Sequence, residues 1–166
     1  MQAIYESKIG MILIESGVRA DGSKALARLD FKEQEQAKYF PLAADVCGDP
    51  IITQCVLELD EYFAGMRRSF DVPLMLNGTA FRQKVWLELA RIPYGMAISY
   101  IELARRVGNP KAPRAVGGAN HNNPISIIIP CHRVIAADGS LCGYGGGVWR
   151  KEWLLEHEGF ALKKRA

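Results

Sequence analysis

A chain of 166 residues can form one sizeable domain or two small domains that share an interface, and 49% hydrophobic residues is ordinary for a globular protein. The net charge of +3 hides an asymmetry, because residues 1–80 carry a net charge of −4 and residues 81–166 a net charge of +7. A solvated surface can have such a bias, but its segregation favours a polyanionic partner for the basic half. The apolar stretch Ile9–Ile14 is too short for a signal core or a membrane span, so we expect no membrane partner.

The cysteine and histidine positions limit the metal chemistry of the chain. The four cysteines are Cys47, Cys55, Cys131 and Cys142, and without a secretion signal we expect reduced thiols. No Cys-x-x-Cys motif is present, and all three histidines lie in the C-terminal half. A zinc site of mixed cysteine and histidine ligands would lack ligands in the N-terminal half, so we expect no metal there.

The N-terminal part of the chain predicts a small sheet followed by a helix. Residues 2–16 and 24–31 alternate enough between apolar and polar side chains to predict strands, and residues 17–22 are a turn region. Asp49 and Pro50 are typical of a helix start, with the aspartate as N-cap and the proline at the first helical position.

The apolar side of that helix is visible in its spacing. Apolar residues recur at intervals of three and four until Gly65 ends the run: Ile52, Cys55, Val56, Leu59, Tyr62 and Phe63. We interpret Cys55, which stands on this stripe, as core filler. Residues 70–76 predict a linker or an edge strand that leads to the turn signal Asn77-Gly78. The second unit is expected to begin after this turn.

The C-terminal part opens with a predicted helix and continues with a helix pair. Thr79 can cap the first helix, and its inward-facing residues are Phe81, Val85, Trp86 and Leu89. Ser99 and Glu102 form a capping box that opens a short helix through Val107. A second short helix, at 113–121, follows a turn that contains glycine, so the pair is a helix-turn-helix candidate. The last helix is predicted at about 148–157.

The most informative feature is the hexapeptide Ile-Pro-Cys-His-Arg-Val at 129–134, directly after the apolar run 125–129. The β-branched run predicts a buried strand, which Pro130 closes because proline cannot donate to a ladder. Cys131 then stands beside His132, and a nearby imidazole or a base-relayed water is the usual means of making a thiolate nucleophile. The alternative is a buried structural cysteine beside a surface histidine, but such a site has no need of the flanking proline and arginine.

These residues and their neighbours resemble the methylated-DNA–protein-cysteine methyltransferases, also called alkylguanine-DNA alkyltransferases. The similarity runs from about Thr79 to Phe160, whereas residues 1–78 match only loosely. Short motifs in register carry it: Ile-Pro-Tyr-Gly at 92–95, Ser99-Tyr100, Arg114-Ala115-Val116-Gly117, Asn122-Asn123-Pro124, the Pro-Cys-His-Arg-Val core, Gly143-Tyr144-Gly145-Gly146, and Lys151-Glu152-Trp153-Leu154-Leu155 ending at His157-Glu158-Gly159.

The resemblance implies an α/β (α+β) fold in two domains. A small ribonuclease-H-like sheet and helix domain at 1–78 would support a winged-helix-like helix-turn-helix domain at 79–166, which binds DNA and transfers the alkyl group. The implied activity is single-turnover DNA repair, in which an alkyl group moves from the carbon-6 oxygen of guanine in duplex DNA to Cys131. A further candidate substrate is 4-O-methylthymine. The resemblance implies no cofactor and no metal, a monomer bound to alkylated double-stranded DNA, and a cytoplasmic location, or a nuclear one in a eukaryote.

The resemblance also assigns catalytic roles. His132 would take the Cys131 proton through a water, and Glu158 would hold the imidazole, as in a hydrolase triad. From spacing alone, Glu158 fits a plain surface residue. Asn123 matches an asparagine that bridges the helix pair to the active-site strand. Tyr100 matches a tyrosine that pushes on the flanking phosphate and donates a hydrogen bond to guanine N3, which lowers the leaving-group barrier.

DNA binding is assigned mainly to the second helix of the pair. Arg114 matches an arginine finger that fills the space left by an extruded nucleotide, because the thiol reaches the lesion only when the nucleotide rotates out. Small residues let this helix enter a narrow groove, and tight packing of Gly117 and Gly118 against another helix is the alternative. The expected DNA-binding set is Ser99, Tyr100, Arg114, Ala115, Gly117, Gly118 and Arg133, with Arg105, Arg106 and Lys111 as further candidates to neutralise phosphates.

The glycine-rich loop 143–147 looks like the family's pocket wall, because glycine permits unusual backbone angles and close approach. The expected substrate-pocket residues are Asn120, Val134, Tyr144 and Gly145. Many relatives carry serine where this chain has Gly145, so a hydroxyl donor is lost while the backbone N–H remains. We interpret Cys142, which adjoins the loop, as a small packing residue.

Two other functions are open from the sequence. A Cys-His-Glu hydrolase would use the same residues on an amide or ester, although the basic C-terminal half and the small-residue helix count against it. A non-reactive alkyltransferase-like protein would bind lesions without chemistry. Because Cys131 is present, the second reading requires a disabled site, and Gly145 is the only visible reason for one.

Overall fold

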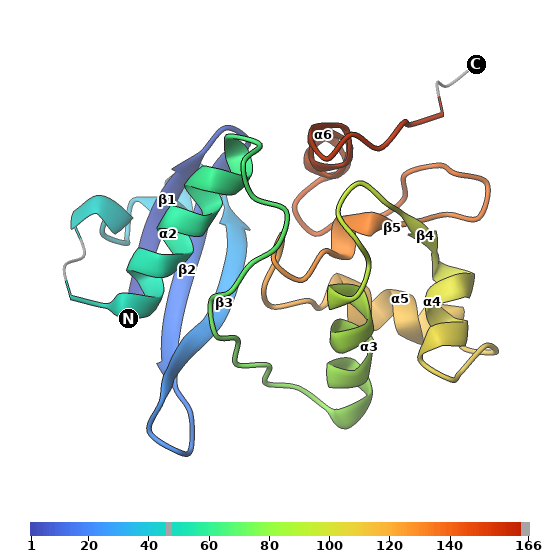
Figure 1. Cartoon of the computed structure of the whole chain (residues 1–166), viewed down its shortest axis with the longest axis horizontal. Coiled ribbons are helices and arrows are strands. Elements are labelled where there is room, and N and C mark those ends of the chain that lie inside the picture. Colours follow the sequence, from blue (N-terminus) through green and yellow to red (C-terminus); the bar gives the residue numbers. More distant parts are fainter. Residues whose placement is uncertain (46–47, 164–166) are drawn as a thin grey trace. The chain divides into compact units, whose positions relative to one another are not determined.

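The computed structural model describes residues 1–45 and 48–163, and these fall into two compact units (Figure 1). The first unit comprises Met1–Asn77 together with Pro124–Ser126, and the second comprises Gly78–Asn123 and the residues from Ile127 onward. Cys47 lies outside the described residues. No helix in the described ranges is long and apolar enough to cross a membrane.

The first unit is built on a three-stranded antiparallel sheet in the order β1 (Gln2–Ser7), β2 (Gly10–Val18) and β3 (Lys24–Lys32). The predicted strand region 2–16 is thus divided by a tight turn, in which the Ser7 hydroxyl donates to the Gly10 carbonyl at 2.6 Å. Strand β2 also continues through Gly17 and Val18, which had been expected to turn.

Both faces of this sheet are covered, which explains why consecutive residues of β2 are buried. Helix α2 (Pro50–Phe63) packs against all three strands, as Figure 1 shows. A cluster of Ile4, Leu13 and Ala37 lies near the short helix α1 (Gln34–Ala37), and a 3₁₀ turn, η1 (Ala43–Asp45), follows. The predicted start of α2 is confirmed, because the Asp49 carboxylate accepts from the amides of Ile51 and Ile52 at 3.0 and 3.1 Å. Cys55 is fully buried, as expected.

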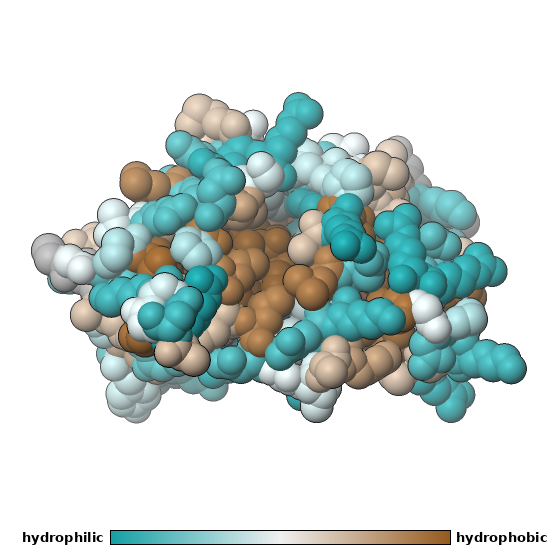
Figure 2. Space-filling model, turned by 60° about the horizontal axis from the view of Figure 1, so that its bottom comes forward, coloured by the Kyte–Doolittle hydropathy of each residue, from teal (hydrophilic) through white to brown (hydrophobic). Residues whose placement is uncertain are grey.

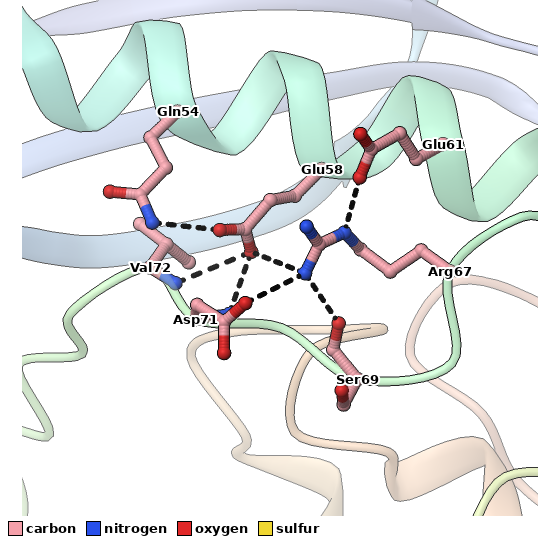
Figure 3. A network of polar contacts seen from close by, with 7 residues as sticks. All are labelled: Gln54, Glu58, Glu61, Arg67, Ser69, Asp71 and Val72. Carbon is pink, nitrogen blue, oxygen red and sulfur yellow. Dashed lines mark hydrogen bonds and ion pairs between the residues drawn. The ribbon is translucent and has the colours of Figure 1, made fainter.

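A polar network holds the segment after α2 against that helix (Figure 3). The buried Glu58 carboxylate accepts from the backbone amides of Asp71 and Val72 at 2.9 and 3.3 Å, and from the Gln54 side chain at 2.7 Å. Arg67 donates to Glu61 at 2.6 Å and to Asp71 at 3.1 Å. The segment 70–76 is therefore held along the unit as an irregular connection. An isolated bridge joins Leu74 to Leu26 of β3, and the Arg19 side chain donates to the Leu74 carbonyl at 2.9 Å.

The second unit is mainly helical, with a small parallel pair of strands. Its elements are α3 (Ala80–Ala90), β4 (Ile98–Ser99), α4 (Tyr100–Arg106), α5 (Pro113–His121), η2 (Cys131–Arg133), β5 (Val134–Ile135) and α6 (Val148–His157). The predicted helices and caps are confirmed: Thr79 accepts from the Arg82 amide at 3.3 Å and Ser99 from the Glu102 amide at 3.1 Å. Helix α5 packs against α3 and α4, and the Trp86 indole donates to the Ala119 carbonyl at 2.8 Å. Phe81, expected to face inward, is only half-buried.

The predicted buried strand at 125–129 is wrong. Ile125 makes an isolated bridge with Leu29, and the chain then turns, with Ile127 in the left-handed region at φ +71°. Ile125, Ile127 and Ile129 are nevertheless buried, so the apolar character of the run reflects burial rather than strand pairing. A short apolar run is consistent with a paired strand and with a buried irregular segment, so its periodicity could not distinguish the two structures.

Candidate active site and nucleic-acid interface

Cys131 stands at the start of the 3₁₀ turn η2 and is 4% exposed. The preceding backbone is held by Asn123, whose side-chain amide donates to the Ile129 carbonyl at 2.7 Å. The side chain of the buried Asn120 lies 3.5 Å from the Cys131 carbonyl oxygen, within the second unit. A β-branched residue at positive φ is rare, and Ile127 adopts this conformation four positions before the thiol. The thiol is therefore presented by a fixed turn rather than by the end of a strand.

His132 and Glu158 form a buried pair, with Nε2 and Oε1 2.8 Å apart. Arg133 encloses the same carboxylate, donating from Nε to Oε2 at 2.8 Å and from Nη2 to Oε1 at 2.9 Å. The Gly95 amide adds a longer contact of 3.3 Å. Within the part of the chain that the structure describes, Nδ1 of His132 has no hydrogen-bond partner, so this ring nitrogen is the one left for proton transfer.

Burial sets the protonation states of this group. It lowers the pKa of His132, and Glu158 opposes that shift only in part. Burial alone would raise the pKa of Glu158, but the hydrogen bonds and charges of His132 and Arg133 outweigh it and hold that pKa well below its usual range. Burial also raises the pKa of Cys131, while Asn123, Lys151 and Tyr144 act in the opposite direction. The resting site is therefore a thiol beside a neutral imidazole that an ionised carboxylate holds.

Tyr100, the first residue of α4, is half-buried. Burial raises the pKa of Tyr100 to about 12, and the charges of the neighbouring Cys142 and Cys131 thiols add to the shift. The phenol is therefore a proton donor at neutral pH. Cys142 is exposed, so its interpretation as a small packing residue is wrong.

The other expected pocket residues differ in exposure. Val134 is fully buried, Tyr144 is half-buried, and Gly145 is exposed. The Tyr144 side chain is among the groups that oppose the rise in the pKa of Cys131. A Cβ at Gly145 would meet only His121 atoms, at 4.0 Å. The loop thus leaves room for a side chain at position 145.

The surface of the helix pair is basic and open. On the face shown in Figure 2, hydrophilic side chains dominate over α4 and α5. Arg105 and Arg106 pair with Glu102 at 3.8 and 3.0 Å, whereas Arg114 is exposed and makes no ion pair with any described residue. This leaves the Arg114 guanidinium available to another molecule.

Small residues on α5 expose its backbone. Ala115 and Gly118 are exposed, and nothing lies within 4 Å of a Cβ built at Gly118, so tight helix packing does not explain this glycine. A Cβ at Gly117 would be in ordinary contact with the Tyr100 ring, at 3.7 Å. The exposed side of α5 is therefore smooth beside the tyrosine.

Two expected DNA contacts have structural roles. The Ser99 hydroxyl is taken up by the cap of α4. Arg133 is buried, and besides Glu158 it donates to the Ile92 carbonyl at 2.5 Å. A guanidinium enclosed in this way is not available to a phosphate, so the DNA contact expected for Arg133 is wrong. Its role as a clamp on Glu158 was missed from the sequence.

Lys151 was also missed as a site residue, although a signal was present. On α6 it precedes Leu154 and Leu155 by three and four positions, and all three are fully buried. That spacing places Lys151 on the inward stripe of the helix. Among the described residues, no group of three or more His, Cys, Asp or Glu side chains is arranged to hold a metal ion.

Comparison with known proteins covers both units. The family profile of the 6-O-methylguanine DNA methyltransferase DNA-binding domain matches residues 80–160, and that of the ribonuclease-like domain of the same family matches residues 1–76. The expected fold class, an α/β protein with a ribonuclease-like and a DNA-binding part, is confirmed.

Individual relatives agree. A Methanosarcina acetivorans protein named methylated-DNA–protein-cysteine methyltransferase is 45% identical over 157 residues, which cover 95% of this chain and 97% of that protein. A protein of the same name from Mycobacterium bovis is 58% identical over 121 residues, covering 72% of this chain and 73% of that protein. The crystal structure of Mycobacterium tuberculosis OGT in complex with DNA matches with a TM-score of 0.78 and 45% identity, covering 95% of this chain and 91% of that one. The resemblance seen in the motifs is thus confirmed, and the chain belongs to the 6-O-methylguanine DNA methyltransferase family.

Proposed function

We propose that this protein takes the alkyl group from the carbon-6 oxygen of guanine in duplex DNA and keeps it on Cys131. The observation that carries the proposal is the buried Cys131 thiol in the same 3₁₀ turn as His132, whose Nε2 atom lies 2.8 Å from Oε1 of the buried Glu158. The fold and family support the same activity. No cofactor enters the proposed reaction.

The chemical step follows from the protonation states. The neutral His132 receives the thiol proton at Nδ1, through a water, and the resulting imidazolium is stabilised by the ionised Glu158. The Cys131 sulfur then attacks the alkyl carbon, a C–S bond forms, and the bond between that carbon and the guanine oxygen breaks. Tyr100 donates to guanine N3 as negative charge develops there. The product thioether has no easy leaving route, so each molecule reacts once.

Access to the lesion requires extrusion of the nucleotide. Cys131 is 4% exposed, so a base that stays in the stack cannot reach it. Arg114 is the exposed cation that would enter the duplex in place of the rotated nucleotide, while the small residues Ala115, Gly117 and Gly118 let α5 lie in the narrow groove. The proposed pocket for the rotated base is formed by Asn120, Tyr144 and the backbone at Gly145.

The same chemistry extends to 4-O-methylthymine, which presents an alkyl ether beside a ring nitrogen. We further propose that the protein acts as a monomer, because Cys131, His132, Glu158 and Tyr100 all come from one compact unit of one chain. Because its substrate is DNA, we expect the protein to be located in the cytoplasm, or in the nucleus of a eukaryote.

The decisive experiment is intact mass spectrometry after mixing the protein with a duplex that contains one 6-O-methylguanine. We expect a single added methyl group, located on Cys131 by peptide mapping, and no turnover beyond one equivalent. Cys131→Ser should abolish transfer and keep lesion binding, whereas Cys142→Ser, the matched control at the exposed thiol, should still be methylated. Methyl on Cys142, or transfer by Cys131→Ser, would remove the assignment of the nucleophile.

The same samples test the other two functions. A hydrolase would release product from a chromogenic ester after an initial burst and would continue to turn over. A non-reactive lesion-binding protein would bind the methylated duplex tightly and show no change of mass.

A further inference from the structure

Lys151 is a fully buried cation for which the proposed chemistry has no use so far. Its position on α6 is flanked by buried leucines, and no carboxylate forms an ion pair with it in the described part of the chain. Burying an unpaired charge is costly, and charged groups at such positions normally have a partner or an anion close by. Groups close to Lys151 must therefore stabilise its buried charge.

Two backbone carbonyls receive the Lys151 ammonium. It donates to the Val134 carbonyl at 2.5 Å and to the Cys142 carbonyl at 3.1 Å. Val134 opens β5 directly after the turn that carries the nucleophile, and Cys142 adjoins the glycine-rich loop. An ammonium has three donors, so these two contacts leave one N–H for another acceptor. Lys151 thus joins the two backbone segments on either side of the site.

The charged and titratable groups around Lys151 are those of the proposed reaction. Its ammonium lies 5.9 Å from the centre of the Tyr100 ring, and it interacts electrostatically with the thiols Cys131 and Cys142 and with His132. Burial lowers the pKa of Lys151, and both thiolates oppose that shift. In turn, the positive charge opposes the rise that burial causes in the pKa of Cys131. Cys142 opposes the shift more than Cys131 does, but Cys142 is exposed, so the Cys131 thiolate is the anion that is buried together with the ammonium.

We propose that Lys151 is a positioning residue for Cys131: it fixes the turn and the glycine-rich loop to each other and supplies the positive charge that favours the thiolate. His132 removes the proton, and Lys151 stabilises the anion that remains. The role in alkyl transfer rests on the proposed function, but the effect on the thiol does not, because any small electrophile reports it.

The test measures thiol reactivity without DNA. Iodoacetamide is reacted with the full-length protein at a series of pH values, and alkylation is followed by peptide mass. Tryptic cleavage after Arg133 places Cys131 and Cys142 on different peptides, so each thiol is followed separately. The variants are Lys151→Gln and Lys151→Met, which remove the charge, and Lys151→Arg, which keeps it.

The expected result is a shift of the Cys131 profile to higher pH in both neutral variants. A shift of one pH unit would make alkylation roughly tenfold slower at pH 7, with recovery at high pH. Lys151→Arg should stay close to the unmodified protein. A variant whose only fault is a loosened fold would lose thermal stability without moving the midpoint of the profile, so an unmoved midpoint in Lys151→Gln and Lys151→Met would overturn the proposal.

The same proteins are then mixed with the methylated duplex, which separates the two proposals. If the unmodified protein transfers no methyl group while the iodoacetamide profile still depends on the charge at residue 151, the proposed function fails and the inference about Lys151 stands. If the unmodified protein transfers the methyl group and both neutral variants keep its iodoacetamide profile, the proposed function stands and the inference about Lys151 fails.

Discussion

His132 and Glu158 are 26 residues apart in the chain, yet their side chains meet at 2.8 Å in a buried part of the second unit. The carboxylate also receives two hydrogen bonds from Arg133, the residue next to the histidine. Glu158 is therefore ionised and immobile, and it leaves only one nitrogen of the imidazole for chemistry. This geometry makes His132 a base of fixed orientation.

Replacing the base should have an effect that depends on pH. His132→Gln removes the proton acceptor, so we expect methyl transfer to slow at pH 7 by about 10²-fold or more, the range of general-base effects. Because burial raises the pKa of Cys131, solvent hydroxide takes over only at high pH, where the rates of variant and unmodified protein should converge. The Tyr100 phenol, with a pKa of about 12, stays protonated through most of this range. Single-turnover rates from pH 6 to 10 measure the effect, and a loss of equal size at all pH values would show a structural role only.

Acid should unfold the protein through Glu158. The folded-state pKa of this group is depressed below its ordinary value of 4.5, so it stabilises the fold above that value. That contribution should decline once the pH falls below about 4.5 and vanish as the pH passes the folded-state pKa. Glu158→Gln leaves the buried Arg133 unpaired and should cost about 3 kcal/mol or more at pH 7. Urea unfolding of both proteins between pH 3 and 7 is the measurement; a parallel acid decline in the variant would contradict the assignment.

The glycine-rich loop should tolerate a side chain at one position and not at another. At Gly145 a Cβ meets only atoms 4.0 Å away, so Gly145→Ser should change the free energy of unfolding by no more than about 0.5 kcal/mol. Gly147 has φ +92°, so Gly147→Ala, the matched control, should cost about 1–2 kcal/mol. If a hydroxyl at position 145 donates to the guanine oxygen, Gly145→Ser should also transfer methyl faster. Thermal unfolding and single-turnover rates measure the two effects. A Gly145→Ser variant that is stable but transfers methyl more slowly would exclude a donor role for a hydroxyl at position 145.

Local chemistry explains which parts of the fold could be predicted. Asp49, Thr79 and Ser99 cap helices through their own neighbouring amides, so the sequence was enough to place those helix starts. The run 125–129 was misassigned because its burial comes from contacts distant in sequence.

The candidate site shows the same division. Cys131 and His132 are adjacent in the chain, so the sequence alone predicted this pair. Arg133 and Lys151 were missed because charged side chains are rarely buried. Their partners lie 25 and 17 residues away, at Glu158 and at the Val134 carbonyl.

Binding to DNA should depend strongly on salt and little on sequence. The helix pair presents Arg105, Arg106, Lys111 and Arg114 beside a helix surface of small residues that offers few groups to base edges. Each phosphate neutralised releases counterion, so log affinity should fall linearly with log salt, by close to one unit of slope per contact. Titrations of an unmodified duplex at several salt concentrations measure the slope. Affinity that is flat between low and physiological ionic strength would exclude this surface as the DNA interface.

Arg114 and Tyr100 should be separable by comparing duplex DNA with free 6-O-methylguanine base. Extrusion costs a few kcal/mol in a duplex and nothing for the free base, so Arg114→Ala should slow repair of the duplex far more than reaction with the base. Tyr100→Phe keeps the ring against Gly117 but removes the phenol, so it should slow both substrates if proton donation to N3 matters. Arg105→Ala is the control, because an arginine paired with Glu102 on the same surface should weaken duplex binding without affecting the chemical step at saturating DNA. Equal losses on both substrates for Arg114→Ala would make this arginine an ordinary structural or phosphate contact rather than the group that replaces the extruded nucleotide.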